Sequence, residues 1–314
     1  MKTSKIKLTL SDGSVVEAQA PLIVSASRAT DIPAFYAGWF FNRLRQGYVR
    51  WRNPYNGKDS YVSFANTKFI VFWSKNPKPL LPFLPILKEM EIGCYIQYTL
   101  NDYFVEGLEP NVPALAERID TFKRLVDELG IGAVVWRFDP LILTNKISTD
   151  DLLNKIEYIA NQLRGYTDKL VFSFADISAY RKVGRNLSEA GVHYREWTEY
   201  EMIDFSHRLS ELNLGLELAT CAEKVDLLQL GIVHNRCIDP NLISRLKPEL
   251  QPYIQNLKTD KGQRTLCGCI TSNDIGTYNS CPHGCVYCYA NANPFSAKQN
   301  FIRHQQNPNN DSIL

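Results

Sequence analysis

Residues 69–77 read FIVFWSKNP, an apolar run that turns polar at its end. Such a run is typical of a strand buried on both faces of a parallel sheet. The same succession of strand and helix then repeats: after a helix at 80–90, strands are expected at 93–102, 133–141, 169–176 and 214–223, and helices at 112–129, 150–163 and 197–212. This alternation predicts parallel β/α units.

One further unit precedes these. Residues 22–24 are a short apolar run, and a helix is expected from Ala34 to Gln46, ended by Gly47. Six units are then visible, and residues 271–281 could supply another. The sequence therefore predicts an α/β fold, a partial TIM-like (β/α) barrel that is open rather than closed.

Polar residues collect where each expected strand ends. They are Ser25, Ser27 and Arg28; Ser74, Lys75 and Asn76; Gln97, Thr99 and Asn101; Arg137 and Asp139; Ser173 and Asp176; and Thr220, Cys221 and Glu223. In a β/α barrel the carboxyl ends of the strands meet at one mouth, so these side chains are candidates for a ligand site. A single polar strand end carries little weight, because strand ends also reach water.

Residues 136–140, WRFDP, are the most specific of these ends. Arg137 and Asp139 alternate with aromatic residues, so both side chains point to the same face of the strand. A charge that points into a barrel needs a partner or a ligand. Either the two residues pair with each other, or Arg137 holds a carboxylate or phosphate. Arg28 and Asp31 pose the same choice.

The composition sets limits on the class of protein. The chain has 314 residues, of which 45% are apolar, and a net charge of +2. Near-neutral charge argues against a strongly basic nucleic-acid binder. No apolar run suits a signal peptide or a membrane span, so a cytoplasmic location and no membrane partner are expected. The expected organisation is a barrel body over residues 1–220, a Cys-rich lobe over 221–294 that completes the barrel, and a polar tail over 295–314.

The eight cysteines are unevenly distributed. Three of them, Cys281, Cys285 and Cys288, form a C-x3-C-x2-C run, here called the triad. Four others, here called the tetrad, are Cys221, Cys237, Cys267 and Cys269. In a reducing compartment such clustering favours metal over disulfides. The remaining Cys94 is expected to pack as a small buried apolar residue.

The triad suits three corners of a 4Fe–4S cluster, which leaves one iron without a protein ligand. Zinc is the alternative, and His283 inside the run would then be a candidate ligand. The tetrad would suffice for a second, fully ligated 4Fe–4S cluster, or some of its cysteines could be structural or bind zinc.

Cys281, Cys285 and Cys288, with Tyr287 before the third, resemble the cluster motif of the radical S-adenosylmethionine (SAM) superfamily. The longer string at 281–291, CPHGCVYCYAN, resembles its spore photoproduct lyase-like branch. Nearly the whole chain also resembles a bacterial family known only as a domain of unknown function, through SASRATDIP at 25–33, WRFDPL at 136–141 and the Cys-rich tail.

The superfamily resemblance implies both a cofactor and a chemistry. The open iron would bind SAM, and an electron from the reduced cluster would cleave SAM to give a radical that takes hydrogen from a substrate. The triad normally follows the first barrel strand; here it comes last, which implies a permuted barrel. Backbone near Tyr287 would meet the adenine. SAM and substrate would be held by polar strand ends that include Ser25, Arg28, Asn101, Arg137, Asp139 and Ser173.

Partners are less specified. The resemblance implies an external electron donor of the flavodoxin or ferredoxin kind. The substrate is unknown; nucleic acid is one option, because a predicted hairpin at 48–64 interleaves Arg50, Arg52 and Lys58 with aromatic residues that include Tyr55. A hairpin with one packed face and one solvated face is the favoured explanation of that pattern. Two other functions stay open, a zinc-dependent β/α-barrel hydrolase and a non-catalytic iron–sulfur sensor or nucleic-acid-binding protein.

Overall fold

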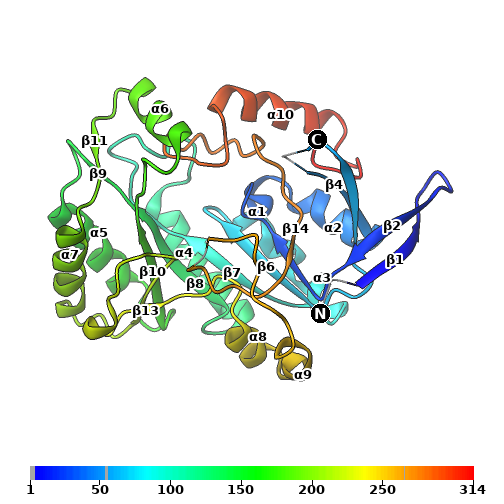
Figure 1. Cartoon of the computed structure of the whole chain (residues 1–314), viewed down its shortest axis with the longest axis horizontal. Helices are drawn as coiled ribbons and strands as arrows, with labels where there is room; N and C mark the ends of the chain where they lie inside the picture. The colour runs from blue at the N-terminus through cyan, green and yellow to red at the C-terminus, as the bar shows by residue number, and fades with distance from the viewer. Residues whose placement is uncertain (1–3, 54–55, 265) are drawn as a thin grey trace.

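A computed structural model describes residues 4–53, 56–264 and 266–314. Its central strands are β3 (Ile23–Ala26), β6 (Phe69–Ser74), β7 (Gly93–Thr99), β8 (Val134–Leu141), β10 (Lys169–Phe174), β12 (Glu217–Thr220), β13 (Val233–His234) and β14 (Asn273–Asp274). They form one eight-stranded parallel sheet in the order β13-β12-β10-β8-β7-β6-β3-β14 (Figure 1). The predicted α/β class with parallel β/α units is confirmed. Within the described residues, β13 and β14 are the two edges and do not pair, so the sheet is not a closed barrel.

Helices α1 to α9 lie between β3 and β14 in the chain, and α10 follows β14. They are α1 (Ile32–Phe35), α2 (Ala37–Gln46), α3 (Leu84–Glu89), α4 (Leu115–Leu129), α5 (Thr149–Gln162), α6 (Arg181–Glu189), α7 (Glu199–Glu211), α8 (Pro240–Leu246), α9 (Gln251–Ile254) and α10 (Pro294–Gln306). Helices α5 and α7 each begin with a capping box, Ser148 with Asp151 and Thr198 with Glu201. Helix α2 ends at Gly47 in the left-handed conformation, where the sequence predicted its end.

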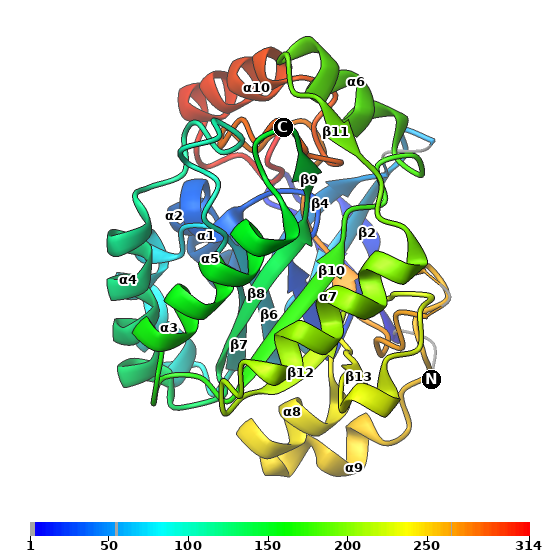
Figure 2. The same ribbon diagram turned by 90° about the vertical axis from the view of Figure 1, so that its left-hand side faces the viewer.

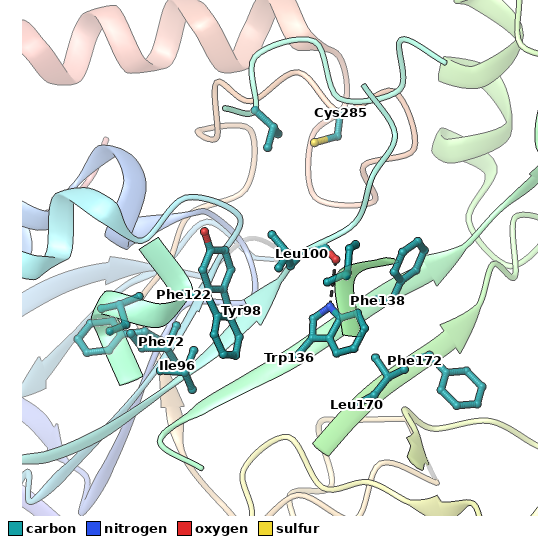
Figure 3. Packing of buried hydrophobic residues seen from close by; sticks show 14 of the residues in the cluster. Phe72, Ile96, Tyr98, Leu100, Phe122, Trp136, Phe138, Leu170, Phe172 and Cys285 are labelled. Atoms are coloured by element: carbon teal, nitrogen blue, oxygen red, sulfur yellow. Dashed lines mark hydrogen bonds between the residues drawn. The ribbon is translucent and has the colours of Figure 1, made fainter. Parts of the chain in front are cut away.

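Alternate residues of each strand face two different cores. Phe72, Ile96 and Trp136 pack with residues of the helices, such as Phe122 of α4 (Figure 3). The neighbours that point to the opposite face belong to a second buried cluster, which includes Val71, Tyr95, Val135 and Val171. That second cluster also contains the four tetrad cysteines and residues of α8 and α9. The Cys-rich segment therefore covers the sheet face that the helices α1 to α7 leave free.

A smaller sheet lies beside the N-terminal strands. It contains β1 (Ser4–Thr9), β2 (Val15–Ala20), β5 (Asp59–Ser63) and β4 (Tyr48–Arg52), in that order. The predicted hairpin is confirmed as β4 and β5; Tyr55 lies outside the described residues. Arg50 pairs with Asp59 at 3.0 Å and with Asp311 at 2.8 Å. This arginine therefore holds the C-terminal segment to the hairpin.

The predicted polar tail, residues 295–314, contains most of α10, which lies with α6 at one end of the molecule, opposite α8 and α9 (Figure 2). Trp39 donates from Nε1 to the carbonyl of Asn310 at 2.8 Å, and Ile313 is buried. Tertiary contacts thus order a segment whose composition is polar.

A short antiparallel pair, β9 (Leu143–Thr144) with β11 (Tyr194–Arg195), completes the strands. Within the part of the chain that the structure describes, no helix is long and apolar enough to cross a membrane.

Candidate functional site

The triad lies in a loop that follows β14, next to β3. Gly284 inside this loop has φ +70°, a conformation that glycine adopts without strain. The backbone of Asn111 donates to the carbonyl of His283 at 3.2 Å, and that of Val286 donates to the carbonyl of Leu108 at 3.1 Å. The loop that follows β7 therefore holds the triad over the core between the sheet and the helices, here called the helix-side core. Cys285 is buried there (Figure 3).

His283 has partners of its own. Its Nε2 lies 2.9 Å from Oδ2 of Asp31, and its Nδ1 lies 3.3 Å from the carbonyl oxygen of Asn111. Asp31 also accepts from Ser74 and from the backbone of Lys75. Burial would raise the pKa of Asp31, but the hydrogen bond and charge of His283 and the other donors hold it below its usual value. Asp31 thus serves the triad loop rather than pairing with Arg28.

Tyr287 lies in a buried polar network. Its hydroxyl donates to Glu109 and lies 2.9 Å from Nζ of Lys75 and 3.2 Å from Nδ2 of Asn101. Lys75 donates to Glu109 at 2.7 Å. Burial would raise the pKa of Glu109, but the charges of Lys75 and Arg118 lower it, so this carboxylate stays ionised beneath the triad.

The same charges act on the triad thiols. Burial raises the pKa of Cys285 well above its ordinary value, while Lys75 opposes that rise and Glu109 adds to it. Burial likewise raises the pKa values of Cys281 and Cys288. Buried thiols of this kind lose their protons when a metal binds them.

The tetrad gathers on the other face of the sheet. The Sγ atoms of Cys221 and Cys237 lie 3.4 Å apart, those of Cys267 and Cys269 lie 3.0 Å apart, and all four cysteines are buried and free. Cys269 also interacts with the thiol of Cys237. Gly268, between the last two, has φ +62° and lets the chain turn between adjacent ligand positions.

Side chains from β7 and β8 hold Cys237 in place. Tyr95 donates from its hydroxyl to the carbonyl of Cys237 at 2.6 Å, and Gln97 donates to the same oxygen at 2.9 Å. Arg137 donates from Nη1 to Sγ of Cys237 at 3.3 Å. Three inward residues of two neighbouring strands therefore fix one tetrad cysteine.

Arg137 and Asp139 form the ion pair that the alternation allowed. Nε of Arg137 lies 3.2 Å from Oδ2 of Asp139, and Nη2 bonds to the same oxygen. Ser173 donates to Oδ1 of Asp139. Burial would raise the pKa of Asp139, but Arg137 lowers it. Asn101 accepts from the backbone of Asp139 at 2.9 Å, and through Tyr287 it links this pair to the triad loop.

Ser25 and Arg28 meet β14 instead. Ser25 donates from Oγ to Asp274 at 2.7 Å, and the backbone of Arg28 donates to the same carboxylate at 2.8 Å. The Arg28 guanidinium lies over the ring of Trp73, 4.7 Å from its centroid. Its Nη2 is buried and has no hydrogen-bond partner. A buried, unpaired nitrogen on a guanidinium whose charge interacts with the thiols of Cys237, Cys267 and Cys269 fits an anionic metal–thiolate group.

Two findings concern whether the described residues form a single-ion metal site or a cavity beside the cysteines. Among residues 4–53, 56–264 and 266–314, no three His, Cys, Asp or Glu side chains are arranged to hold a single metal ion. One small cavity of about 80 Å³ is lined by Glu106, Thr144 and Val192, and a surface hollow lies between α5 and α7. Neither is lined by triad or tetrad residues.

Sequence reasoning missed two carboxylates. Glu109 lies in an irregular loop, where no periodic pattern indicates that a charge is buried. Asp274 lies in a two-residue strand whose partner, β3, is some 250 residues away in the chain. The sequence showed Lys75 as a polar residue at a strand end. Its ion pair with Glu109 and its contact with the Tyr287 hydroxyl could not be predicted without Glu109. Cys94, expected to pack as a small buried apolar residue, is partly buried against the core on the helix side of the sheet, and burial raises the pKa of its thiol to about 12.

Comparison with known proteins adds one positive result. No curated protein and no solved structure matches the chain. A family model described as a domain of unknown function (DUF1848) matches residues 23–290, which include both cysteine groups, and the chain therefore belongs to that family.

Proposed function

We propose that the chain is a radical SAM enzyme whose triad holds a 4Fe–4S cluster with one open iron. The observation that carries this proposal is the bonding of His283 to Asp31 and to a carbonyl. With the histidine engaged, the C-x3-C-x2-C run offers three thiols and no fourth ligand. Three protein ligands leave one iron of the cluster free for a small molecule.

The absence of a ready single-ion site is compatible with this cofactor. The thiolates of a cubane bind separate irons, so they need not converge on one point as ligands of a single ion do. A cluster held by Cys281, Cys285 and Cys288 would, when reduced, supply the electron for reductive cleavage of SAM, and the resulting radical would remove hydrogen from a substrate. The chain's own residues hold the loop, bury its thiols and exclude water.

Individual residues take distinct roles in this proposal. Lys75, Glu109 and Asn101 fix Tyr287, which sets the position of Cys288 beside it. Backbone near Tyr287 would meet the adenine. Ser25, Arg28, Asp139 and Ser173 lie at strand ends and would position SAM or substrate.

The sheet order supports reading the fold as a partial, permuted TIM-like barrel. From β3 to β13 each strand lies beside the next central strand in the chain, as in a β/α barrel. Strand β14 precedes the triad and lies beside β3, at the position of a first strand. A triad at the end of the chain would thus occupy the place that normally follows strand one.

The tetrad is proposed to hold a second 4Fe–4S cluster. Four buried free thiols and the unpaired Nη2 of Arg28 suit an anionic centre. An electron donor of the flavodoxin or ferredoxin kind and a cytoplasmic location belong to the same proposal. The substrate class stays open, and Arg50 of the hairpin is already paired with Asp59 and Asp311.

The test is anaerobic reconstitution of the full chain, followed by iron and sulfide counting and an assay for 5′-deoxyadenosine with SAM and dithionite. About eight irons per chain are expected with both clusters, and about four with the triad alone. Cys285→Ala should abolish SAM cleavage but keep tetrad iron. Reconstituted protein that binds zinc and forms no 5′-deoxyadenosine would instead favour the zinc-dependent hydrolase. Protein with cluster but no SAM cleavage would favour the sensor or nucleic-acid-binding alternative.

A further inference from the structure

Arg137 contacts both the tetrad, through Cys237, and Asp139 at the carboxyl end of β8, where polar strand ends including Ser173 form what is here called the mouth. Its Nη1 donates to Sγ of Cys237 at 3.3 Å and to Oε1 of Gln97 at 3.2 Å. Its Nε and Nη2 donate to Asp139. The Arg137 side chain is 4% exposed and that of Asp139 24% exposed, so the arginine is buried and its carboxylate partner reaches solvent.

We propose that Arg137 tunes the reduction potential of the tetrad cluster, and that Asp139 sets the strength of this effect from the mouth. This inference rests on the proposed second cluster. Reduction adds one negative charge to a cluster, so an N–H donor and a positive charge at a ligand sulfur favour the reduced form. Hydrogen bonds to ligand sulfurs and the charge around them are the protein's means of setting such potentials.

The fixed geometry makes the contact effective. Tyr95 and Gln97 hold the carbonyl of Cys237, so the sulfur cannot turn away from Arg137 without breaking these bonds. The pair lies in a low-dielectric interior, where a charge acts more strongly than at the surface. Arg28 and Arg264 add positive charge nearby, and both interact with tetrad thiols.

Asp139 also affects the reduction potential of the tetrad cluster, through Arg137. Its carboxylate partly neutralises the Arg137 guanidinium, so the cluster experiences less than a full positive charge. Ser173 donates to the carboxylate of Asp139, and Asn101 accepts from the backbone N–H of Asp139. These two hydrogen bonds keep the carboxylate in place. A cationic or hydrogen-bonding ligand that engages Asp139 would weaken this neutralisation. Binding in the mouth would then raise the tetrad potential.

The experiment uses the full chain with the triad replaced by alanine, Cys281→Ala, Cys285→Ala and Cys288→Ala, so that only tetrad iron gives a signal. Iron is counted, and the midpoint potential is measured by redox titration followed by electron paramagnetic resonance. Arg137→Gln should shift the midpoint to a more negative potential, and Asp139→Asn should shift it to a more positive one. Arg208→Gln, on the surface of α7, is the matched control and should leave it unchanged.

Opposite signs distinguish tuning from damage, because general loosening of the site would move both variants the same way. Unchanged midpoints, or shifts of equal sign, would overturn the inference. If the triad-free chain folds but holds no cluster, both this inference and the second cluster fail, while SAM cleavage by the intact triad is judged separately. If the triad-free chain does not fold, the titration is run on chains with the triad, where SAM alters only the signal of the open-iron cluster.

Discussion

Nε2 of His283 lies 2.9 Å from Oδ2 of Asp31, so the histidine inside the cysteine run is bonded to the residue that caps α1. The contact joins the C-terminal loop to the first β/α unit. It also makes a prediction that separates a structural histidine from a metal ligand.

His283→Gln should keep the triad iron close to that of the wild type, because the glutamine amide can still donate to Asp31. His283→Ala should lower stability by about 1–3 kcal/mol, because Asp31 loses one of its buried partners. Iron counts after reconstitution and urea unfolding measure the two effects. Loss of iron in His283→Gln, comparable to that in Cys285→Ala, would make His283 a ligand and return zinc to consideration.

Glu109→Gln should destabilise the fold by about 3–5 kcal/mol, since it leaves Lys75 and Arg118 as uncompensated buried charges. Glu117→Gln is the control. Glu117 pairs with Lys78 at 2.8 Å, but both side chains are nearly half exposed, so its loss should cost about 0–1 kcal/mol. Equal costs for the two variants in chemical denaturation would refute the buried network as a source of stability.

The same carboxylate predicts a pH dependence. The pKa of Glu109 is lower in the folded chain than its ordinary value of 4.5. Its stabilising effect is therefore full above pH 4.5 and is lost as the pH falls through the lower folded value. The gap in unfolding free energy between wild type and Glu109→Gln should narrow in that acid range. A gap that widens on acidification would contradict the assigned ion pairs.

Gly284→Ala should destabilise the triad loop by about 1–2 kcal/mol and weaken iron retention, because alanine disfavours φ +70°. A Cβ there would also lie 3.0 Å from Nδ2 of Asn111. Gly165→Ala tests strain alone, since Gly165 has φ +82° with nothing within 4 Å of an added Cβ. It should cost similar stability without loss of iron. Iron loss in both variants, or in neither, would argue against a local effect at the triad.

Trp136→Phe should cost about 2–3 kcal/mol. The residue is fully buried and donates from Nε1 to the carbonyl of Leu100 at 3.1 Å (Figure 3), so the change leaves a cavity and an unpaired carbonyl. Trp51→Phe removes a similar bond, to Gly276 at 2.9 Å, from a partly exposed residue and should cost about 1 kcal/mol. Thermal or urea unfolding of both variants compares them directly.

Local patterns predicted the units but not their assembly. The apolar run at 69–77 and the alternation at 136–140 placed β6 and β8, and Gly47 placed the end of α2. The C-x3-C-x2-C spacing predicted the triad, and the four other clustered cysteines were assigned to the tetrad because their number suffices for a second site. The pairing of β14 with β3 and the bonding of Glu109 beneath Tyr287 depend on contacts between distant segments, which no short window contains. α10 was obscured by its polar composition, because packing rather than periodicity orders it.

The attachment of β14 to β3 has a consequence for biogenesis. On the ribosome, the strands from β3 to β12 are complete before Cys221, the first of the seven clustered cysteines, is added; the eighth, Cys94, lies apart in β7. The early chain can therefore collapse around its helix-side core in the absence of iron. In the proposed enzyme, iron would then be delivered late, after both cysteine groups are synthesised and before the final segment docks and buries their thiols.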